Sequence, residues 1–363
     1  MTRSGHASAK ALTTKIRWMI EEEPFLLSYF PHSLNYLHSR IFMKSSFPHF
    51  LTRCLLWLGA IVALPGLSRA EAPATPIPSA TPARAVPGLP PGARALLDLP
   101  YVSHGHPRQK LNLYLPQKPG GPLLVWIHGG GWRAGTKDNP PGLALVNGGA
   151  AVASVEYRFS QDAIFPAQIE DCKAAIRWLR AHAKEYGYDP KRVGVWGASA
   201  GGHLTALLAV TGQVRDFDVG ENLDQSSAVQ CAVDLFGPAD FPAYDPAIPD
   251  PSVKRENPDS VLAQLFGGPI SQKMELARRA SPVTWVTKAA APMLIMQGSN
   301  DPLVPMDQSQ RLADKLKAAG AEVKLDIIEG AGHGTKEFWT TEKLKAIAEF
   351  LVDHWRAAIA PPP

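Results

Sequence analysis

The chain has 363 residues, 45% of them apolar, and a formal net charge of +4 at pH 7. This composition allows one large globular domain or two small ones and excludes a fibrous, a disordered and a multi-span membrane protein. Residues 1–70 hold eight Lys or Arg and three Glu, whereas the remainder holds 29 basic and 30 acidic residues. Because residues 71–363 are nearly neutral in sum, they show no excess of basic side chains that would bind nucleic acid, and no nucleic-acid partner is expected.

Residues 43–70 are typical of a secretory signal peptide, with basic residues near the start, an apolar stretch at 54–67 and a small-x-small cleavage site at 68–70. The apolar stretch is shorter than the about 20 residues of a membrane-spanning helix, which favours export over the alternative of a membrane anchor or a buried helix. We expect a secreted or periplasmic protein that leaves the membrane once the signal is removed. Residues 1–42 are interpreted as an upstream extension, with Met43 as an alternative start.

Residues 71–93 are rich in Pro, Ala and Thr and have no core-forming pattern. Such a composition predicts an extended, semi-rigid linker. A single catalytic domain is expected to follow at residues 94–359.

Strand and helix patterns alternate through this domain. Residues 111–115 alternate at period two, which predicts a half-exposed antiparallel edge strand. Apolar runs that suit strands covered on both faces follow at 122–127, 151–157, 192–196, 229–236, 292–297 and 322–328. Helical periodicity is found at 166–186, 202–210, 307–319 and 335–358. The alternation predicts an α/β fold with a doubly wound, mostly parallel sheet.

One sizeable interruption, residues 237–286, follows the sixth strand. It is rich in Pro and Asp and has one helical piece at 260–266. The segment is long enough for a small flap but not for a large lid, and no helical cap is expected before the first strands. We therefore expect an open, shallow site that suits a substrate with a bulky side.

Two cysteines, Cys172 and Cys231, lie within the predicted domain. In an exported protein, two cysteines can form a disulfide bond, so a bridge between them is one interpretation. Cys172, however, is expected in the helix that leaves one end of the sheet, and Cys231 in a strand that starts at the other end. Because a disulfide needs the two Cα atoms close together, two buried thiols are favoured over a bridge.

The pentapeptide GASAG, residues 197–201, lies between the run 192–196 and the helical segment 202–210. A strand, a G-x-S-x-G turn and a helix in that order make a nucleophile elbow. The turn is so tight that only residues with little or no side chain fit two positions either side of the serine. The pattern predicts Ser199 as a nucleophile held at the tip of the turn.

A second glycine-rich segment, HGGGW at residues 128–132, follows the run that ends at residue 127. Three glycines let the main chain approach a ligand and aim its N–H groups inward. We expect the N–H groups of Gly130, Gly131 and Ala200 to form an oxyanion hole.

Three further side chains, two of them within this segment, have predicted roles. His128 is expected to brace the loop rather than to act as a catalyst. Trp132 and Phe165 are candidates for the lining of an acyl pocket, with packing in the core as the alternative.

Asp301 and His333 each follow the end of a later predicted strand, and reactive groups gather at the carboxyl ends of the strands of an open parallel sheet. The order Ser, Asp, His suits a triad on such a sheet. His333 would take the proton of Ser199 and return it to the leaving alcohol, while Asp301 orients the imidazole.

Other ionisable residues are interpreted differently. Asp240, after the run 229–236, is the alternative acid, although such loop carboxylates usually cap turns. His203 is expected to be a hydrogen-bonded core histidine, and Asp171 and Glu170 are expected to be structural. No cluster has metal-site spacing, and no dinucleotide or Walker pattern is present, so no metal and no cofactor are expected.

Four blocks carry a family resemblance, namely HGGGW at 128–132, residues 157–203, GSNDPLVP at 298–305 and GAGHG at 330–334. Over residues 97–355 the chain resembles the α/β-hydrolase superfamily. It is most similar to the bifunctional feruloyl and acetylxylan esterases, which adjoin the hormone-sensitive-lipase-like esterases.

The resemblance implies a triad of Ser199, Asp301 and His333, with Gly130, Gly131 and Ala200 as oxyanion donors. Hormone-sensitive-lipase-like esterases usually carry an N-terminal helical cap, and the lack of one here favours a carbohydrate ester over a lipid substrate.

The sequence therefore predicts a secreted serine carboxylesterase that removes acetyl or feruloyl groups from plant cell-wall polysaccharide. A general short-chain carboxylesterase acting on small-molecule esters is the first alternative. A peptidase-like hydrolase lacks the length for a gating domain, and a binding protein on a disused hydrolase fold would lack a catalytic group. No pattern indicates an oligomeric state.

Overall fold

The computed structural model describes residues 86–244 and 248–359, which fall in one compact unit. The predicted upstream extension, the signal peptide and residues 71–85 of the linker lie outside the described residues. None of the helices in the described ranges combines the length and the apolar character that crossing a bilayer requires.

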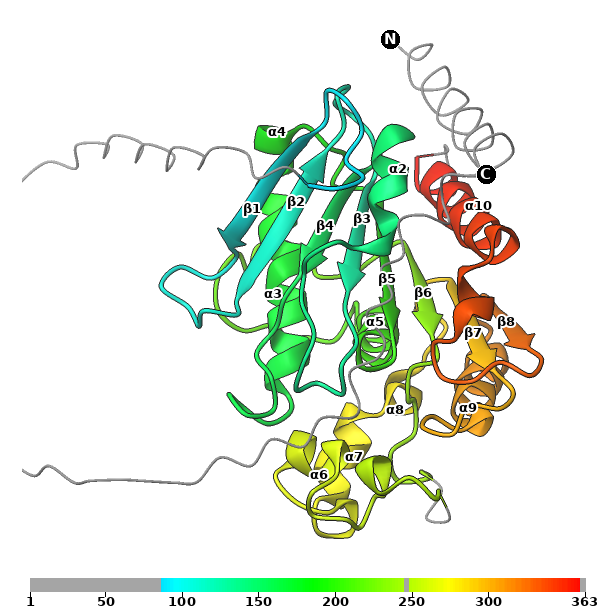
Figure 1. The fold of residues 1–363 in the computed structure, drawn as a ribbon. Coiled ribbons are helices and arrows are strands. Elements are labelled where there is room, and N and C mark those ends of the chain that lie inside the picture. The colour runs from blue at the N-terminus through cyan, green and yellow to red at the C-terminus, as the bar shows by residue number, and fades with distance from the viewer. Residues whose placement is uncertain (1–85, 245–247, 360–363) are drawn as a thin grey trace, which may run out of the picture. The chain divides into compact units, whose positions relative to one another are not determined.

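The described residues form one eight-stranded sheet in the order β1-β2-β4-β3-β5-β6-β7-β8 (Figure 1). The strands are β1 Arg94–Pro100, β2 Lys110–Leu115, β3 Leu123–Ile127, β4 Ala151–Val155, β5 Val193–Ala198, β6 Cys231–Leu235, β7 Met293–Gly298 and β8 Val323–Ile328. β2 pairs antiparallel with β1 and β4, and every later pair is parallel. The doubly wound, mostly parallel sheet is confirmed.

The two strands for which the predicted exposure is wrong are β2 and β8. β2 is antiparallel as predicted, but it is not a half-exposed edge strand, because β1 pairs along its other side. Its polar residue Asn112 is buried, and the Asn112 amide accepts a hydrogen bond from Asp98 N–H at 3.0 Å and donates one to Asp138 at 3.0 Å. β8 is the opposite edge of the sheet, and only Ile328 of that strand is buried.

Helices cover both faces of the sheet. The α-helices are α2 Ala144–Asn147, α3 Ala167–Ala181, α4 Ala183–Tyr186, α5 Ala200–Val210, α6 Val261–Phe266, α7 Met274–Ala280, α8 Pro282–Trp285, α9 Met306–Ala318 and α10 Thr341–Ala357. Short 3₁₀ turns lie at Pro141–Leu143, Pro251–Val253, Ile270–Gln272 and Lys336–Trp339. The segment predicted as one helix at 166–186 is two helices, separated at His182.

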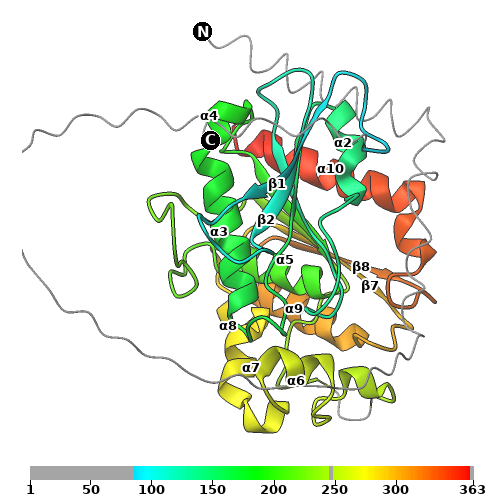
Figure 2. The same cartoon turned by 60° about the vertical axis from the view of Figure 1, so that its left-hand side comes forward.

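Alternate side chains of β3 enter two separate apolar cores. Leu123, Val125 and Ile127 join the core beneath α3, α5 and α9, whereas Leu124 and Trp126 join the core beneath α2 and α10. Figure 2 shows α3 and α10 on opposite sides of the sheet. Because both faces are covered, the central strand β3 is apolar along its whole length.

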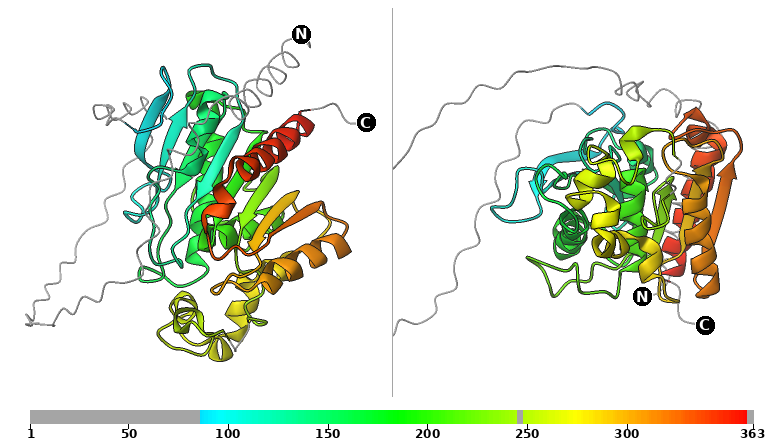
Figure 3. Two further views of the ribbon diagram at one scale, coloured as in Figure 1. Left: turned by 45° about the vertical axis from the view of Figure 1, so that its right-hand side comes forward. Right: turned by 90° about the horizontal axis from the view of Figure 1, so that it is seen from below.

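The insertion between β6 and β7 holds three helices, α6, α7 and α8, where one helical piece was expected. It lies at the end of the sheet toward which the parallel strands point (Figure 3). A Cβ atom on Gly131 would lie 3.1 Å from Cγ1 of Val261 in α6. The insertion therefore packs beside the glycine-rich loop that follows β3.

Both cysteines of the described residues are free and buried, as predicted. Cys172 lies within α3 and Cys231 opens β6.

Candidate active site

The turn between β5 and α5 has the geometry expected of a nucleophile elbow. Ser199 has φ 56° and ψ −120°, a strained conformation for a residue with a Cβ atom. A Cβ atom on Gly201 would lie 2.1 Å from the carbonyl oxygen of Ile127, and one on Gly197 would lie 2.3 Å from the carbonyl oxygen of Gly201. The close approach of main chains therefore requires glycine at both positions, as predicted.

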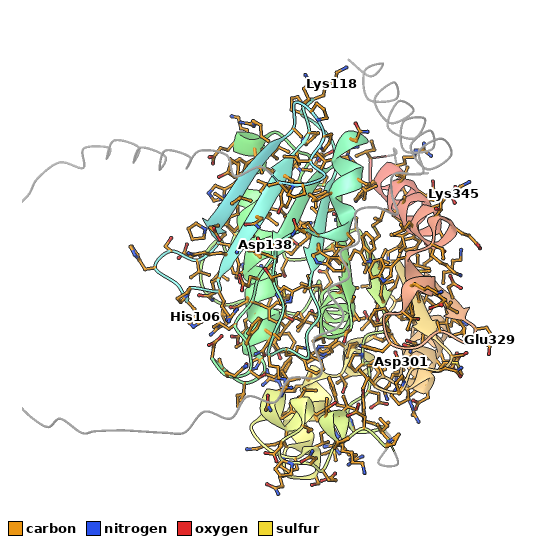
Figure 4. The ribbon with its side chains drawn as sticks, in the orientation of Figure 1. His106, Lys118, Asp138, Asp301, Glu329 and Lys345 are labelled. Atoms are coloured by element: carbon orange, nitrogen blue, oxygen red, sulfur yellow. The ribbon has the colours of Figure 1, made fainter. Side chains whose placement is uncertain are left out.

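Hydrogen bonds join Ser199, His333 and Asp301 in one chain. His333 Nε2 lies 2.8 Å from Ser199 Oγ, and His333 Nδ1 lies 2.7 Å from Asp301 Oδ2. The Asp301 side chain is fully buried, whereas that of His333 is 17% exposed. Figure 4 labels Asp301 at the carboxyl end of β7, and Lys118 at the opposite end of the sheet. The structure thus brings together the three residues that the sequence selected.

The Asp301 carboxylate is held by four hydrogen bonds. Its Oδ1 accepts from the N–H groups of Leu303 and Val304, each at 2.9 Å. Its Oδ2 accepts from His333 Nδ1 and from the amide of Gln297 at 3.2 Å. Sequence reasoning missed Gln297, although a polar residue at the end of a buried apolar strand was a signal that could have revealed it.

The alternative acid, Asp240, has other partners. Its Oδ1 accepts from Ala243 N–H at 3.4 Å, its Oδ2 lies 3.9 Å from Arg311, and its own N–H donates to Gln308. Within the described residues it makes no hydrogen bond to His333. The structure therefore pairs the imidazole with Asp301.

The two other histidines near the elbow are buried and uncharged. His203 Nδ1 accepts from the Trp132 indole at 3.1 Å, which leaves Nε2–H to donate to the Ala280 carbonyl at 2.7 Å. His128 Nδ1 lies 2.7 Å from the Gly129 carbonyl, so it braces the glycine-rich loop. Burial lowers the pKa of each imidazole to about 4. Both interpretations are confirmed.

The acidic residues of α3 are structural, as expected. Asp171 is buried and accepts hydrogen bonds from the Arg158 guanidinium, at 2.8 Å to Nη2 and 2.9 Å to Nε, and from Gln109. Glu170 lies 3.5 Å from the same guanidinium.

The glycine-rich loop lies beside the serine. A Cβ atom on Gly129 would lie 3.3 Å from Cβ of Ser199. Gly130 and Gly131 have φ of 112° and 59°, conformations that favour glycine, and their N–H groups have no acceptor among the described residues. Ala200 is the first residue of α5, where an N–H group has no intrahelical acceptor. The three predicted donors thus have no acceptor within the described residues, and their hydrogen bonds to an oxyanion stay a prediction.

Trp132 and Phe165 are buried, at 2% and 1% exposure. The Trp132 ring packs edge-on against His203 and Phe241, and Phe165 packs against Phe217. The structure gives both side chains a packing role, and their contact with an acyl group stays a prediction.

Sequence reasoning also missed a buried carboxylate beneath the elbow. Asp234, near the end of β6, is 1% exposed, and its Oδ1 accepts from Gly237 N–H at 2.9 Å. A Cβ atom on Gly202 in α5 would lie 2.4 Å from that oxygen. Burial raises the pKa of Asp234 from 3.8 to about 7, because the carboxylate loses its hydration and its Oδ2 has no hydrogen-bond partner within the described residues.

This pKa predicts a pH-dependent stability. The folded protein binds the Asp234 proton more tightly than the unfolded chain, so the free energy of unfolding should fall as the pH rises from 3.8 to about 7. Asp234→Asn removes the titration and keeps an oxygen for Gly237. Its stability relative to the wild type should rise by about 4 kcal/mol at most between pH 4 and pH 8. Urea unfolding of both proteins at the two pH values measures this, and a difference independent of pH would contradict it.

A family model described as BD-FAE matches residues 111–316, more than half of the chain. The chain belongs to the BD-FAE family of α/β-hydrolases. The family resemblance drawn from the four motif blocks is confirmed.

Relatives of this BD-FAE chain are named esterases. It is 31% identical over 237 residues to Esterase LipC of Mycobacterium tuberculosis. The aligned region covers 63% of this chain and 57% of LipC. Carboxylesterase NlhH of the same organism is 30% identical over 251 residues, with 68% of this chain and 74% of NlhH covered. The chain thus spans little more than half the length of LipC.

A solved structure described as a truncated form of a carbohydrate esterase from gut microbiota matches the BD-FAE chain with a TM-score of 0.66 and 31% identity. The match covers 72% of this chain and 96% of that one. The fold of the described domain is therefore that of an esterase of the α/β-hydrolase type.

Proposed function

We propose that the protein is an exported serine carboxylesterase that removes acetyl or feruloyl groups from plant cell-wall carbohydrate. The observation that carries the proposal is the hydrogen-bonded chain from Asp301 through His333 to Ser199. It supplies the orienting acid, the base and the nucleophile that acyl transfer requires. The names of the relatives favour an ester over a peptide as the substrate.

Acylation begins at Ser199. Its Oγ attacks the acyl carbonyl carbon while its proton moves to His333 Nε2, and the carbonyl oxygen becomes an oxyanion. The N–H groups of Gly130, Gly131 and Ala200 donate to that oxyanion, and each such donor contributes about 3–4 kcal/mol in acyl-transfer enzymes. Asp301 stabilises the imidazolium that forms.

The tetrahedral intermediate then collapses. His333 Nε2–H protonates the alcohol oxygen as the carbon–oxygen bond breaks, which leaves an acyl group on Ser199. A water molecule gives one proton to His333 and attacks the acyl carbonyl. Collapse of this second intermediate returns the proton to Ser199 Oγ and releases the carboxylic acid.

The carbohydrate part of the proposal rests on two supports. One is the likeness to the gut carbohydrate esterase, whose chain is covered almost in full. The other is the motif resemblance to feruloyl and acetylxylan esterases. The names of LipC and NlhH support the general short-chain carboxylesterase as the second candidate.

One substrate panel tests the two candidates. Purified protein is assayed on p-nitrophenyl acetate, p-nitrophenyl butyrate, methyl ferulate, acetylated xylan and aminoacyl-nitroanilides, with fluorophosphonate-treated protein as the blank. We expect turnover of p-nitrophenyl acetate together with release of acetate from xylan or of ferulate from its methyl ester. Cleavage of the two nitrophenyl esters alone would favour the general carboxylesterase, and turnover of aminoacyl-nitroanilides alone would favour a peptidase.

Export is tested separately. When the full chain is expressed in a host that recognises bacterial signal peptides, the protein should appear outside the cytoplasm with Glu71 as its first residue. N-terminal sequencing measures this, with Ala70→Leu at the expected cleavage site as the control. Retention of residues 43–70 in an active cytoplasmic protein would contradict export.

A further inference from the structure

The end of β6 contacts both the serine and the histidine of the candidate triad. The Leu235 carbonyl accepts a hydrogen bond from Ser199 N–H at 2.9 Å. The ring of the next residue, Phe236, packs edge-on against the His333 imidazole, with 4.7 Å between ring centroids and 64° between planes. Two consecutive residues, Leu235 and Phe236, thus contact the candidate nucleophile and the candidate base.

The Phe236 ring is enclosed by the loop that carries His333. It is 3% exposed, and it also packs edge-on with Phe338, at 4.6 Å between ring centroids. A Cβ atom on Gly334, which has φ 65°, would lie 3.3 Å from Cζ of Phe236. The loop from His333 to Phe338 therefore closes around this ring, so the place of the ring constrains the place of the imidazole.

The backbone of Phe236 is held in an unfavourable conformation. Its φ is 45°, in the left-handed region that bulky side chains rarely adopt. Two hydrogen bonds maintain it, from Phe236 N–H to the Met296 carbonyl at 2.8 Å and from Gly237 N–H to Asp234 Oδ1 at 2.9 Å. Strained residues of this kind gather at functional sites, where the surrounding structure over-determines them.

We propose that Phe236 is a positioning residue for His333, and that Asp234 acts through it by holding the turn that aims its ring at the imidazole. The catalytic part of this inference rests on the proposed function. The edge-on contact restricts rotation of the imidazole and keeps Nε2 within hydrogen-bond reach of Ser199. Acyl transfer depends steeply on such placement, since a displacement of about 1 Å can cost about 10²-fold in rate.

The first experiment compares Phe236→Leu with the wild type in the full chain. With p-nitrophenyl acetate we expect kcat to fall about 10- to 100-fold while KM stays within about twofold, because the base is displaced and the binding surface is not. Proton NMR should show the downfield resonance of His333 Nδ1–H, in its hydrogen bond to Asp301, broadened or lost.

The second experiment separates the shape of Asp234 from its charge. Asp234→Asn keeps an oxygen that accepts from Gly237 N–H, whereas Asp234→Ala does not. At one fixed pH we expect the Asn variant to keep kcat within about threefold and the Ala variant to lose about tenfold. Equal values of kcat in the two variants would reject the role of Asp234 and of the turn.

Leu351→Ala is the matched control. Leu351 is fully buried in the same apolar core as Phe236 but lies on α10, against Gly194 near the start of β5. We expect a lower thermal midpoint with an unchanged kcat and an unchanged downfield resonance. An equal loss of kcat in this control, or an unchanged kcat and resonance in Phe236→Leu, would overturn the proposal.

These outcomes also separate this inference from the proposed function. A wild-type protein without esterase activity would reject the function, and the downfield resonance would still test whether Phe236 positions His333. If Phe236→Leu does not fold, the comparison of Asp234→Asn with Asp234→Ala decides the question.

Discussion

Replacing Ser199 with alanine should lower kcat for p-nitrophenyl acetate by roughly 10⁴- to 10⁶-fold. The Oγ atom that lies 2.8 Å from His333 Nε2 is then missing, so no acyl-enzyme forms. Stability should change little, because alanine is the smaller side chain and the strained turn is maintained by backbone contacts. Steady-state kinetics with purified protein measures the effect, and circular dichroism verifies the fold.

Ser103→Ala is the control for this variant. Ser103 is exposed in the loop after β1, where its hydroxyl and its N–H both donate to Glu221. We expect it to keep wild-type kcat and to be labelled by a fluorophosphonate, whereas Ser199→Ala should not be labelled. Residual activity above one tenth in Ser199→Ala would mean that another residue is the nucleophile.

Asp301→Asn should lower kcat by about 10⁴-fold. Oδ1 of residue 301 is held by the N–H groups of Leu303 and Val304, both at 2.9 Å, so the carbonyl oxygen of asparagine takes that place. Its NH₂ group then faces His333 Nδ1 and needs an acceptor there. The imidazole therefore adopts the tautomer with its proton on Nε2, which cannot accept the proton of Ser199.

Asp240→Asn is the matched control, since Asp240 is the other candidate acid on this side of the sheet. Its carboxylate has no hydrogen bond to His333 within the described residues, and we expect kcat to change by less than about threefold. Both variants are compared by kcat and by the downfield resonance of His333. A larger loss of kcat in Asp240→Asn than in Asp301→Asn would show that Asp240, and not Asp301, is the acid of the triad.

The three residues that meet were accessible to sequence reasoning because each follows a strand of a parallel sheet. Ser199, Asp301 and His333 come after β5, β7 and β8. These strands are parallel, so their carboxyl ends lie at the same end of the sheet. Their order along the chain and the glycines around them were enough to select them from many other polar residues.

The residues that support them were not accessible in the same way. Phe236 looks like an ordinary member of an apolar run, while Gln297 and Asp234 are polar residues within such runs, a signal that does not reveal which partner they bind. Each matters because of a group far away in the chain, such as the bond from Gln297 to Asp301 or the contact of the Phe236 ring with His333. A pattern of nearby residues holds no record of such approaches.

Local chemistry in the sequence determined the parallel strands, the helices of the two layers and the turn at Ser199. Apolar runs have to be buried on both faces, and a turn between crowded main chains admits only glycine at residues 197 and 201. Tertiary structure alone decided that β1 covers β2, that the insertion holds three helices and that Phe236 lies against His333. Pairing and packing between distant segments depend on the whole set of competing partners, which no single stretch of residues specifies.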